Sequence, residues 1–596
     1  MEKNKKVRIG CASAFWGDTY TAAKQLVTKG NLDYLVFDFL AEVSMSILAG
    51  ARLKNPDMGY ATDFVRQIVP LLDQIKMNKV KILSNAGGIN PDACKTIIEK
   101  EARAQGIKLK IAVVKGDNLL DRLELLKEMG ITEMESNNTI PDSCVSINAY
   151  LGAPGILKAI ENDADIIITG RCVDSALVLA PLMHEFNWAT SDYDMIASGS
   201  LAGHIIECGA QCTGGNFTDW KKVKGFHNMG FPFVDVYQNG EFIVSKPQET
   251  GGLVSFGTVA EQFLYEIGNP SEYILPDVVC DFRNVTITEL NSNQVLVKGA
   301  KGNSPTNTYK VSATYMDGYR VAGTLVIGGK ESKRKGELIA EAIIKKCSIL
   351  LEENGLSPFT KTSFDLIGSD SIYGHQKSKS NTKEIVLRLL ARHPKKEALV
   401  ILSRELAQAA TGMAAGVINY LGGRPSVSPS IHLFSFLLPK NLISVEMKID
   451  NKSTSVEIST EGEYLPNDFY QEKENQKELN TDAFTPLINL AFARSGDKGN
   501  HANIGIIARK PHYFTFIDNA LDCNAISKYF QHVTKGKIYK WIVPGINGLN
   551  FLLKDSLGGG GMASLNIDPQ GKGYAQQLLE YPIPVSKKLL TEINKK

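Results

Sequence analysis

The chain has 596 residues, more than a single hydrophobic core usually supports, so at least two domains are expected. Its 43% hydrophobic and 22% charged residues are typical of a soluble globular protein, and a net charge of +2 favours neither nucleic acid nor a membrane surface as partner. No apolar run approaches the roughly 20 residues of a membrane helix, and the basic start MEKNKKVRIG lacks the apolar core of a secretory signal. Nine widely spaced cysteines argue against a disulfide framework and indicate a reducing, cytoplasmic protein.

The first 220 residues alternate strand-like and helix-like segments. Strands are expected at 7–12, 34–40, 80–83, 109–114 and 165–169. Helices are expected at 19–29, at 61–76, and from near Pro91, Asn118 and Asp174. This alternation predicts an α/β fold, with a parallel sheet covered by helices on both faces. Ligands of such sheets bind beyond the carboxyl ends of the strands.

The pattern becomes β-rich from about 221 to 465, so residues 1–465 are expected to form one N-terminal region in two parts. Strands are expected at 231–244, 278–285, 294–297, 309–327 and 361–368, and helices at 332–354, 383–392 and 407–419. The polar, charged segment 466–482 predicts a linker. Residues 483–596 then form a compact C-terminal module with its own strands and helices.

Polar residues follow several strands of the predicted parallel sheet. The candidate ligand contacts at these strand ends are Asp38, Asn85, Gly87, Gly88 and Asp117. Asp38 and Glu42 could divide acid and base roles, or serve as helix cap and surface charge. The Asn85–Gly88 turn lacks the full GxGxxG fingerprint, which makes a nicotinamide role unlikely.

The segment Gly170–Asp174 directly follows the strand that ends at Thr169. Arg171 would stand at the mouth of the sheet, where a guanidinium can hold a carboxylate or phosphate through two hydrogen bonds. Alternatively, Arg171 pairs with Asp174 and fixes the loop. Asp174 could also cap the following helix.

His204, Glu207 and Cys208 lie at helical spacing on one face, which Cys212 extends by a turn. His204 and Glu207 could form an acid–base pair. Zinc is a weaker alternative, because the sequence has no defined second pair of ligands. A buried structural histidine bonded to Glu207 is the third interpretation.

The segment 490–509, LAFARSGDKGNHANIGIIAR, contains two strand-like runs separated by a polar loop with glycine. Positive charge and outward N–H groups there suit an anion, although a solvated hairpin would give the same pattern. The candidate contacts are Arg494, Ser495, Asp497, Lys498 and Asn500. A four-glycine run at 558–561 could lie beside this loop, or form a flexible surface loop.

Several of these segments, in this order, resemble the acyclic terpene utilization (AtuA) family. They are DYLVFDFLAE (33–42), SNAGGINP (84–91), AYLGAPG (149–155), ADIIITGRCVDS (164–175), GHIIECGAQCTGG (203–215) and ARSGDKGNHANIGIIAR (493–509). The resemblance implies a small ferredoxin-like α+β fold for the C-terminal module. It also implies a place in the breakdown of branched acyclic terpenes through acyl-CoA intermediates, without defining the reaction.

We therefore expect an enzyme of acyclic terpene or branched acyl-CoA catabolism with acid–base hydratase or lyase chemistry. In this hypothesis Arg171 orients a carboxylate or thioester, and His204 and Glu207 move protons. The 494–500 loop would hold a CoA phosphate or close the site from the second domain. The expected partners are a small-molecule substrate, with acyl-CoA as a candidate, and further copies of the chain, with no nucleic acid, membrane or bound metal. The alternative is a non-catalytic acyl-CoA-binding or assembly protein associated with an acyl-CoA carboxylase.

Overall fold

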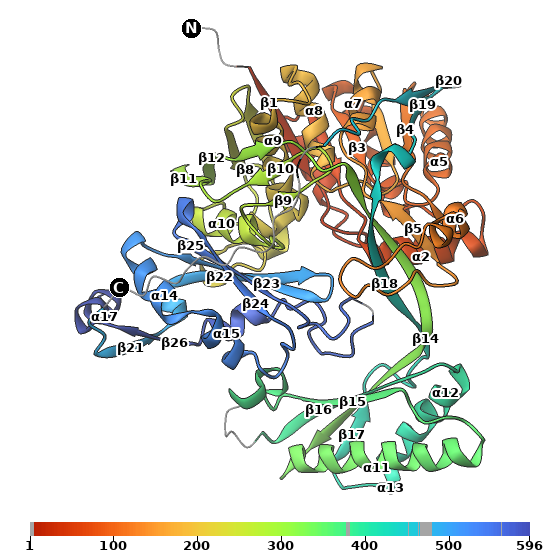
Figure 1. Ribbon diagram of the computed structural model, residues 1–596, viewed down its shortest axis with the longest axis vertical. Coiled ribbons are helices and arrows are strands. Elements are labelled where there is room, and N and C mark those ends of the chain that lie inside the picture. The colour runs from red at the N-terminus through yellow and green to blue at the C-terminus, as the bar shows by residue number, and fades with distance from the viewer. Residues whose placement is uncertain are drawn as a thin grey trace.

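A computed structural model describes residues 5–376, 382–450, 452–462, 464, 479–561 and 563–595 (Figure 1). Its centre is a run of parallel strands that confirms the predicted α/β class. In spatial order these are β1 (Lys6–Cys11), β2 (Tyr34–Phe37), β3 (Lys81–Ser84), β6 (Ile166–Thr169) and β4 (Ile111–Lys115). Nearly every side chain of β2, β3 and β6 is buried, as expected where both faces of a parallel sheet are covered.

Two helical layers cover the two faces of this sheet. One layer contains α1 (Ala22–Lys29), α2 (Glu42–Lys54), α3 (Thr62–Ile68), α4 (Leu72–Asn78) and α5 (Pro91–Ala104). The other contains α7 (Pro154–Glu161), α8 (Ala176–Phe186) and α9 (Tyr193–Glu207), and α6 (Leu123–Glu128) lies nearby. The single helix expected at 61–76 is interrupted by a 3₁₀ turn at Val69–Leu71, because Pro70 lacks the N–H that a continuous helix needs. Among the described residues, no helix has the length and apolar character needed to cross a bilayer.

Strands from beyond residue 220 extend the same sheet to eleven strands. On the β1 side it continues through β7 (Phe233–Tyr237), β8 (Phe242–Ser245), β12 (Gln294–Lys298) and β11 (Thr286–Asn291). On the β4 side it continues through β19 (Val445–Ile449) and β20 (Lys452–Val456). The parallel and β-rich parts therefore share one sheet. A small sheet of β9 (Tyr273–Ile274), β10 (Val279–Asp281) and β13 (Lys301–Asn303) lies beside α9.

The 21-residue strand β14 (Thr308–Gly328) joins this region to a distal part of the molecule (Figure 1). Its first half pairs with β5 (Ser146–Ala149) and β18 (Ser428–Pro439). Its second half forms a sheet, here called the distal sheet, with β15 (Lys361–Ile367), β16 (Glu384–His393) and β17 (Val417–Tyr420). Helices α11 (Ser332–Glu353) and α12 (Lys396–Glu405) cover one face of the distal sheet.

Two helix predictions in this distal part are wrong. Residues 383–392 form strand β16, in which Ile385, Leu387 and Leu389 alternate with less buried residues and point to the helices. Their leucine content favours a helix, but the burial period of two requires a strand. The helix expected at 407–419 is replaced by a 3₁₀ turn at Leu406–Gln408, the short α13 (Ala409–Gly412) and β17.

The C-terminal domain has an antiparallel sheet in the order β22 (Ala491–Lys498), β23 (His501–Ala508), β25 (Gly548–Leu553) and β24 (Ile538–Val543). A second pair of strands is β21 (Ala483–Pro486) and β26 (Pro582–Val585). The helices are α14 (Phe514–Ala520), α15 (Cys523–Tyr529), α16 (Tyr574–Leu578) and α17 (Lys587–Asn594). Most of the linker expected at 466–482 lies outside the described residues, which resume at 479.

This domain docks on α10 (Phe256–Leu264) and on the turn that follows it. Asn503 Nδ2 donates to the Leu264 carbonyl at 2.7 Å, and Asn550 Nδ2 donates to the Gly268 carbonyl at 2.6 Å. At the rim, Arg509 holds both carboxylate oxygens of Asp219, at 2.7 and 2.6 Å. The two asparagines are fully buried, so these bonds satisfy groups that have no access to water.

Replacing Arg509 with Met should destabilise the docked domain by about 2 kcal/mol at pH 7, since a hydrogen-bonded charge pair is lost. Burial opposes ionisation of Asp219, but bonds from Arg509 and Lys222 outweigh it and lower the pKa to about 2. The stabilisation by the Arg509–Asp219 pair is therefore complete above about pH 4, and it is lost as the pH falls towards 2. Urea unfolding of the wild type and the variant at pH 7 and pH 3 measures this difference in the free energy of unfolding. Arg103→Met, at a residue whose side chain is 79% exposed, is the control, and equal effects of the two variants would contradict the prediction.

Candidate functional site

The carboxyl ends of the parallel strands bring the predicted strand-end residues together. Asn85 Nδ2 donates to Asp38 Oδ1 at 2.6 Å, and Asn85 Oδ1 accepts from the Phe39 amide at 2.8 Å. The amide of Arg171 donates to Asp117 Oδ2 at 2.8 Å. All of these side chains are buried. Glu42 begins α2, and its side chain lies outside the described part of the chain.

Glycines at this edge allow close packing between protein segments. A Cβ on Gly87 would lie 2.5 Å from the Thr169 carbonyl, and one on Gly88 would lie 2.4 Å from Leu48. Protein atoms therefore occupy the space beside both glycines, where a ligand was expected. A Cβ on Gly170 would lie 2.3 Å from the Asp117 carboxylate, so this glycine lets Asp117 reach the Arg171 amide.

Arg171 and Asp174 form the predicted pair. Arg171 Nη1 donates to Asp174 Oδ1 at 2.9 Å and also to the Leu40 carbonyl. The Arg171 guanidinium lies 4.3 Å from the centroid of the Tyr150 ring. The expected helix cap by Asp174 is wrong, because Ser175 occupies the N-cap of α8 and Asp174 turns to Arg171 instead. The Asp174 side chain is 33% exposed, so solvent reaches this pair.

His204 is fully buried near the end of α9, and both of its ring nitrogens have partners. Nδ1 lies 3.0 Å from Glu207 Oε1, and Nε2 lies 3.2 Å from the Phe263 carbonyl. Burial and the nearby charge of Lys498 lower the pKa of His204 to about 4, so the ring is neutral at pH 7. A carbonyl can only accept, so Nε2 carries the hydrogen and Nδ1 accepts. Glu207 must then donate, which makes it a protonated carboxylic acid.

The zinc alternative has no geometric support. Helix α9 ends at Glu207, and Cys212 lies beyond a further 3₁₀ turn at Gly209–Gln211, so the predicted extension of the helical face to Cys212 is wrong. The Cys212 thiol donates to the Gly209 carbonyl. Within the described residues, no group of three His, Cys, Asp or Glu side chains is placed to hold a metal ion.

The polar segment expected as a loop at 495–500 is mostly strand. Ser495 to Lys498 belong to β22 and pair with Ile504 to His501 of β23, leaving only a two-residue turn. Their alternate amides therefore serve the hairpin ladder and cannot converge on an anion. The four-glycine run does lie beside this turn, where the Gly559 amide donates to Asn500 Oδ1 at 2.6 Å.

The side chains of this hairpin mostly bond within the protein. Arg494 Nη1 donates to the Asn216 carbonyl at 2.6 Å and lies 3.8 Å from Glu261. Ser495 Oγ accepts from the Ala575 amide at 2.9 Å. Asp497 and Asn500 bond to Gln570 and Asp555. Lys498 differs, because it points across the domain boundary and its Nζ lies 5.3 Å from the centroid of the Tyr273 ring.

Four carboxyl groups and two cations meet at this boundary and are here called the acid cluster. The members are Asp38, Asp174, Glu207, Glu266, Arg171 and Lys498. Burial raises the pKa of Asp38, Glu207 and Glu266, and the charge of Asp174 raises all three further. Lys498 opposes the rise at Glu207 and Glu266, and Arg171 opposes it at Asp38 and Glu207. With more carboxyls than cations, Asp38, Glu207 and Glu266 hold their protons to higher pH than free carboxyl groups do.

Sequence reasoning missed Glu266 and Tyr273. Glu266 lies just after α10 with a φ of 58°, and its amide donates to Asn503 Oδ1 of the C-terminal domain at 2.9 Å. No spacing or motif in the sequence marks this residue. Glu266 comes to lie beside Lys498 only because the C-terminal domain docks there.

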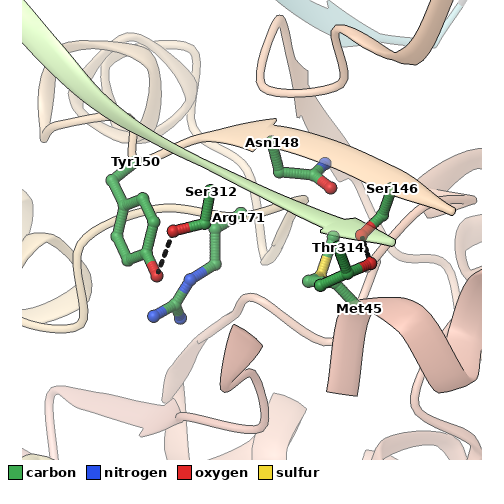
Figure 2. A pocket seen from close by; sticks show the side chains of 7 residues that line it. All are labelled: Met45, Ser146, Asn148, Tyr150, Arg171, Ser312 and Thr314. Carbon is green, nitrogen blue, oxygen red and sulfur yellow. Dashed lines mark hydrogen bonds between the residues drawn. The ribbon is translucent and has the colours of Figure 1, made fainter. Parts of the chain in front are cut away.

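A narrow pocket, with room for about one water molecule, adjoins Arg171 (Figure 2). It is lined by Met45, Ser146, Asn148, Tyr150, Arg171, Ser312 and Thr314. Figure 2 shows Ser146 and Asn148 on β5 facing Ser312 and Thr314 of β14. Asn148 Nδ2 donates to Asp117 at 2.8 Å, whereas the buried Asn148 Oδ1 has no hydrogen-bond partner among the described residues. The pocket thus presents an acceptor that a ligand's hydroxyl or amide could satisfy.

Fold and site together define a two-domain α/β protein in which buried carboxyl groups of raised pKa lie where the domains meet. The model of the family described as acyclic terpene utilisation family protein AtuA matches residues 7–449, and the AtuA ferredoxin-like domain matches residues 485–584. The chain belongs to the AtuA family of acyclic terpene utilisation proteins. No curated protein and no solved structure matches the chain.

Replacing Gly170 with Ala should destabilise the protein by about 1–3 kcal/mol, because the new methyl group overlaps the Asp117 carboxylate. The matched control is Gly50→Ala in α2, where nothing lies within 4 Å of the added Cβ. That control should be neutral or stabilise by up to about 1 kcal/mol. Thermal unfolding of both variants measures the difference. A Gly170→Ala protein as stable as the wild type would show that Asp117 is not held as described.

Proposed function

We propose that the protein catalyses the reversible loss of water, or a related carbon–carbon cleavage, from a branched or terpenoid acyl thioester or carboxylate. The observation that carries this proposal is the neutral His204 paired with a protonated Glu207, within reach of the charges of Arg171 and Lys498. A buried carboxylic acid that keeps its proton at neutral pH is suited to donate it to a leaving group. Family membership supplies the terpene context.

In this mechanism the two cations hold the charge that develops on the substrate. Arg171 or Lys498 would bind the carboxylate or the oxygen of the thioester carbonyl, and would stabilise an enolate formed there. The solvent-accessible Asp174 would take the proton from the carbon beside the carbonyl. Glu207 would turn its acid proton from His204 Nδ1 to the departing hydroxyl, which leaves as water.

His204 acts in this proposal as a positioning residue. Its Nε2 is held by a backbone carbonyl, and its Nδ1 is held by Glu207, so neither nitrogen is open to substrate. The neutral ring fixes the orientation of the Glu207 carboxyl and accepts a hydrogen bond from the acid form. This modifies the expectation that His204 itself moves the substrate proton.

The narrow pocket would receive the part of the substrate that carries a hydroxyl. Asn148 Oδ1 offers it an acceptor, and Arg171 forms part of the wall. The pocket has room for little more than a water-sized group, so it could take a single hydroxyl but no larger part of the substrate. The remainder of an acyl-CoA would therefore lie outside this pocket.

Replacing Glu207 with Gln should lower kcat about 10²–10⁴-fold, because the amide cannot supply the proton. The assay follows interconversion of branched 3-hydroxyacyl-CoA and 2-enoyl-CoA thioesters, and their cleavage products, by mass spectrometry. The control is His227→Ala, at an exposed residue that does not belong to the acid cluster. Binding of the thioesters without any turnover by the wild type would refute the enzyme proposal and favour an acyl-CoA-binding protein.

The pH dependence of kcat/KM tests the role of Lys498 separately. Glu207 acts in its protonated form, so kcat/KM should fall as the pH rises through its raised pKa. Lys498 lowers that pKa, so Lys498→Met should move the alkaline limb to higher pH, whatever its effect on the maximal rate. Lys345→Met, at an exposed position on α11, should leave the limb in place. An unshifted limb in Lys498→Met would contradict the assignment of Glu207 as the titrating acid.

A further inference from the structure

The distal sheet has two chemically different faces. Val321, Leu325 and Leu387 lie on the face that packs against α11 and α12. The opposite face carries a row of cations. Lys361 of β15 pairs directly with Arg392 of β16, and Arg392 pairs directly with Arg320 of β14. Directly paired residues share a face, so these three cations stand side by side and are here called the basic row.

A fourth cation belongs to the same face. Arg388 lies four residues before Arg392 on β16, at a spacing that returns to the same side of a strand. Arg388 Nη1 lies 2.8 Å from Asp365 and donates to the Leu565 carbonyl of the C-terminal domain at 3.1 Å. The basic row therefore lies where the distal sheet meets the C-terminal domain.

Like charges directly opposite each other in a sheet destabilise it. Burial lowers the pKa of Arg320, and the positive charges of Arg388 and Arg392 lower it further. Burial likewise lowers the pKa of Lys361, with added effects from Lys535 and Arg392. Asp365 pairs with Arg388 at 2.8 Å and offsets part of this charge. Asp317 pairs with Arg392 at 3.1 Å, but its side chain is 62% exposed and gives a screened compensation.

The basic row remains open to a ligand. Ala322, two residues beyond Arg320 on the same face of β14, is exposed. The Arg392 side chain is 17% exposed, and its Nη2 contacts Asp317 and His432. Arginine side chains held at fixed spacing on strands are well suited to phosphate, because a guanidinium presents two parallel donors.

We propose that the basic row binds the phosphate groups of a small-molecule ligand. The anion would neutralise cations that the fold holds together at an energetic cost. The site is distinct from the acid cluster and does not depend on the reaction there.

Strand β14 connects the basic row to the narrow pocket. Thr314 lines the pocket, and Arg320 lies six residues further along the same strand, about 20 Å at 3.3 Å per residue. A ligand that reaches both places must be long, with a reactive group at one end and phosphates at the other. The nucleotide end of CoA fits this description. Naming CoA as the source of the phosphates rests on the proposed function, whereas the phosphate site itself does not.

The test is calorimetric titration of the full-length protein with adenosine 3′,5′-bisphosphate and with inorganic pyrophosphate in low-salt buffer. We expect binding that weakens when salt is added. Arg320→Gln combined with Arg392→Gln should weaken it at least tenfold. Arg334→Gln is the matched control, because Arg334 is an exposed arginine of α11 in the same distal part. Lys361→Gln, at an exposed side chain, should weaken binding several-fold and guards against a folding defect in the double variant.

The arms of the experiment separate the sources of phosphate. Tighter binding of the bisphosphate than of pyrophosphate supports a nucleotide ligand such as CoA, and equal binding supports a site for free phosphates. The proposal would be overturned if neither anion binds at millimolar concentration, or if the double variant binds them as tightly as the wild type. A Glu207→Gln protein should bind the bisphosphate like the wild type. If the wild type binds the bisphosphate but turns over no thioester, the proposed reaction is refuted and the proposed phosphate site is not.

Discussion

The central constraint on this protein is the gathering of four carboxyl groups, three of them buried, at one place with two cations of the acid cluster to balance them. Removing ionised carboxylates from water is costly unless partners compensate, and otherwise the groups keep their protons. Arg171 comes from the end of a parallel strand, whereas Lys498 comes from the C-terminal domain. Stability of the cluster and docking of that domain are consequently linked, and the buried Asn503 and Asn550 hold the interface that places Lys498.

The same arrangement explains why functional groups occur at junctions between parts of the chain. The acid cluster lies between the large sheet and the C-terminal domain, and the narrow pocket lies between β5, β14 and the sheet edge. The distal sheet meets the C-terminal domain through Arg388. Strand β14 connects these places because it pairs with β5 at one end and with β16 at the other. Both regions that the family models match therefore contribute side chains to the acid cluster.

The predicted placement of residues at the strand ends was confirmed where a local pattern and its structural consequence coincide, whereas their role as ligand contacts stays a prediction. Asp38, Asn85, Asp117 and Arg171 follow buried strands, and the carboxyl ends of parallel strands necessarily share an edge. The predictions were wrong where two patterns compete. Residues 383–392 have the composition of a helix and the burial period of a strand, and their position beneath α11 decided between them. Residues 495–498 look like a polar loop but complete a strand ladder against β23.

The sequence by itself determined the α/β class, the family and the residues at the strand ends, because hydrophobic periodicity and ordered motifs are local properties of the chain. Only the tertiary structure decided that Glu207 has a raised pKa, that Lys498 points across the domain boundary and that Glu266 belongs to the acid cluster. A pKa depends on burial and on charges within a few ångströms, and these charges come from residues hundreds of positions apart. The register that aligns Lys361, Arg392 and Arg320 is likewise a property of paired strands, which no single segment encodes.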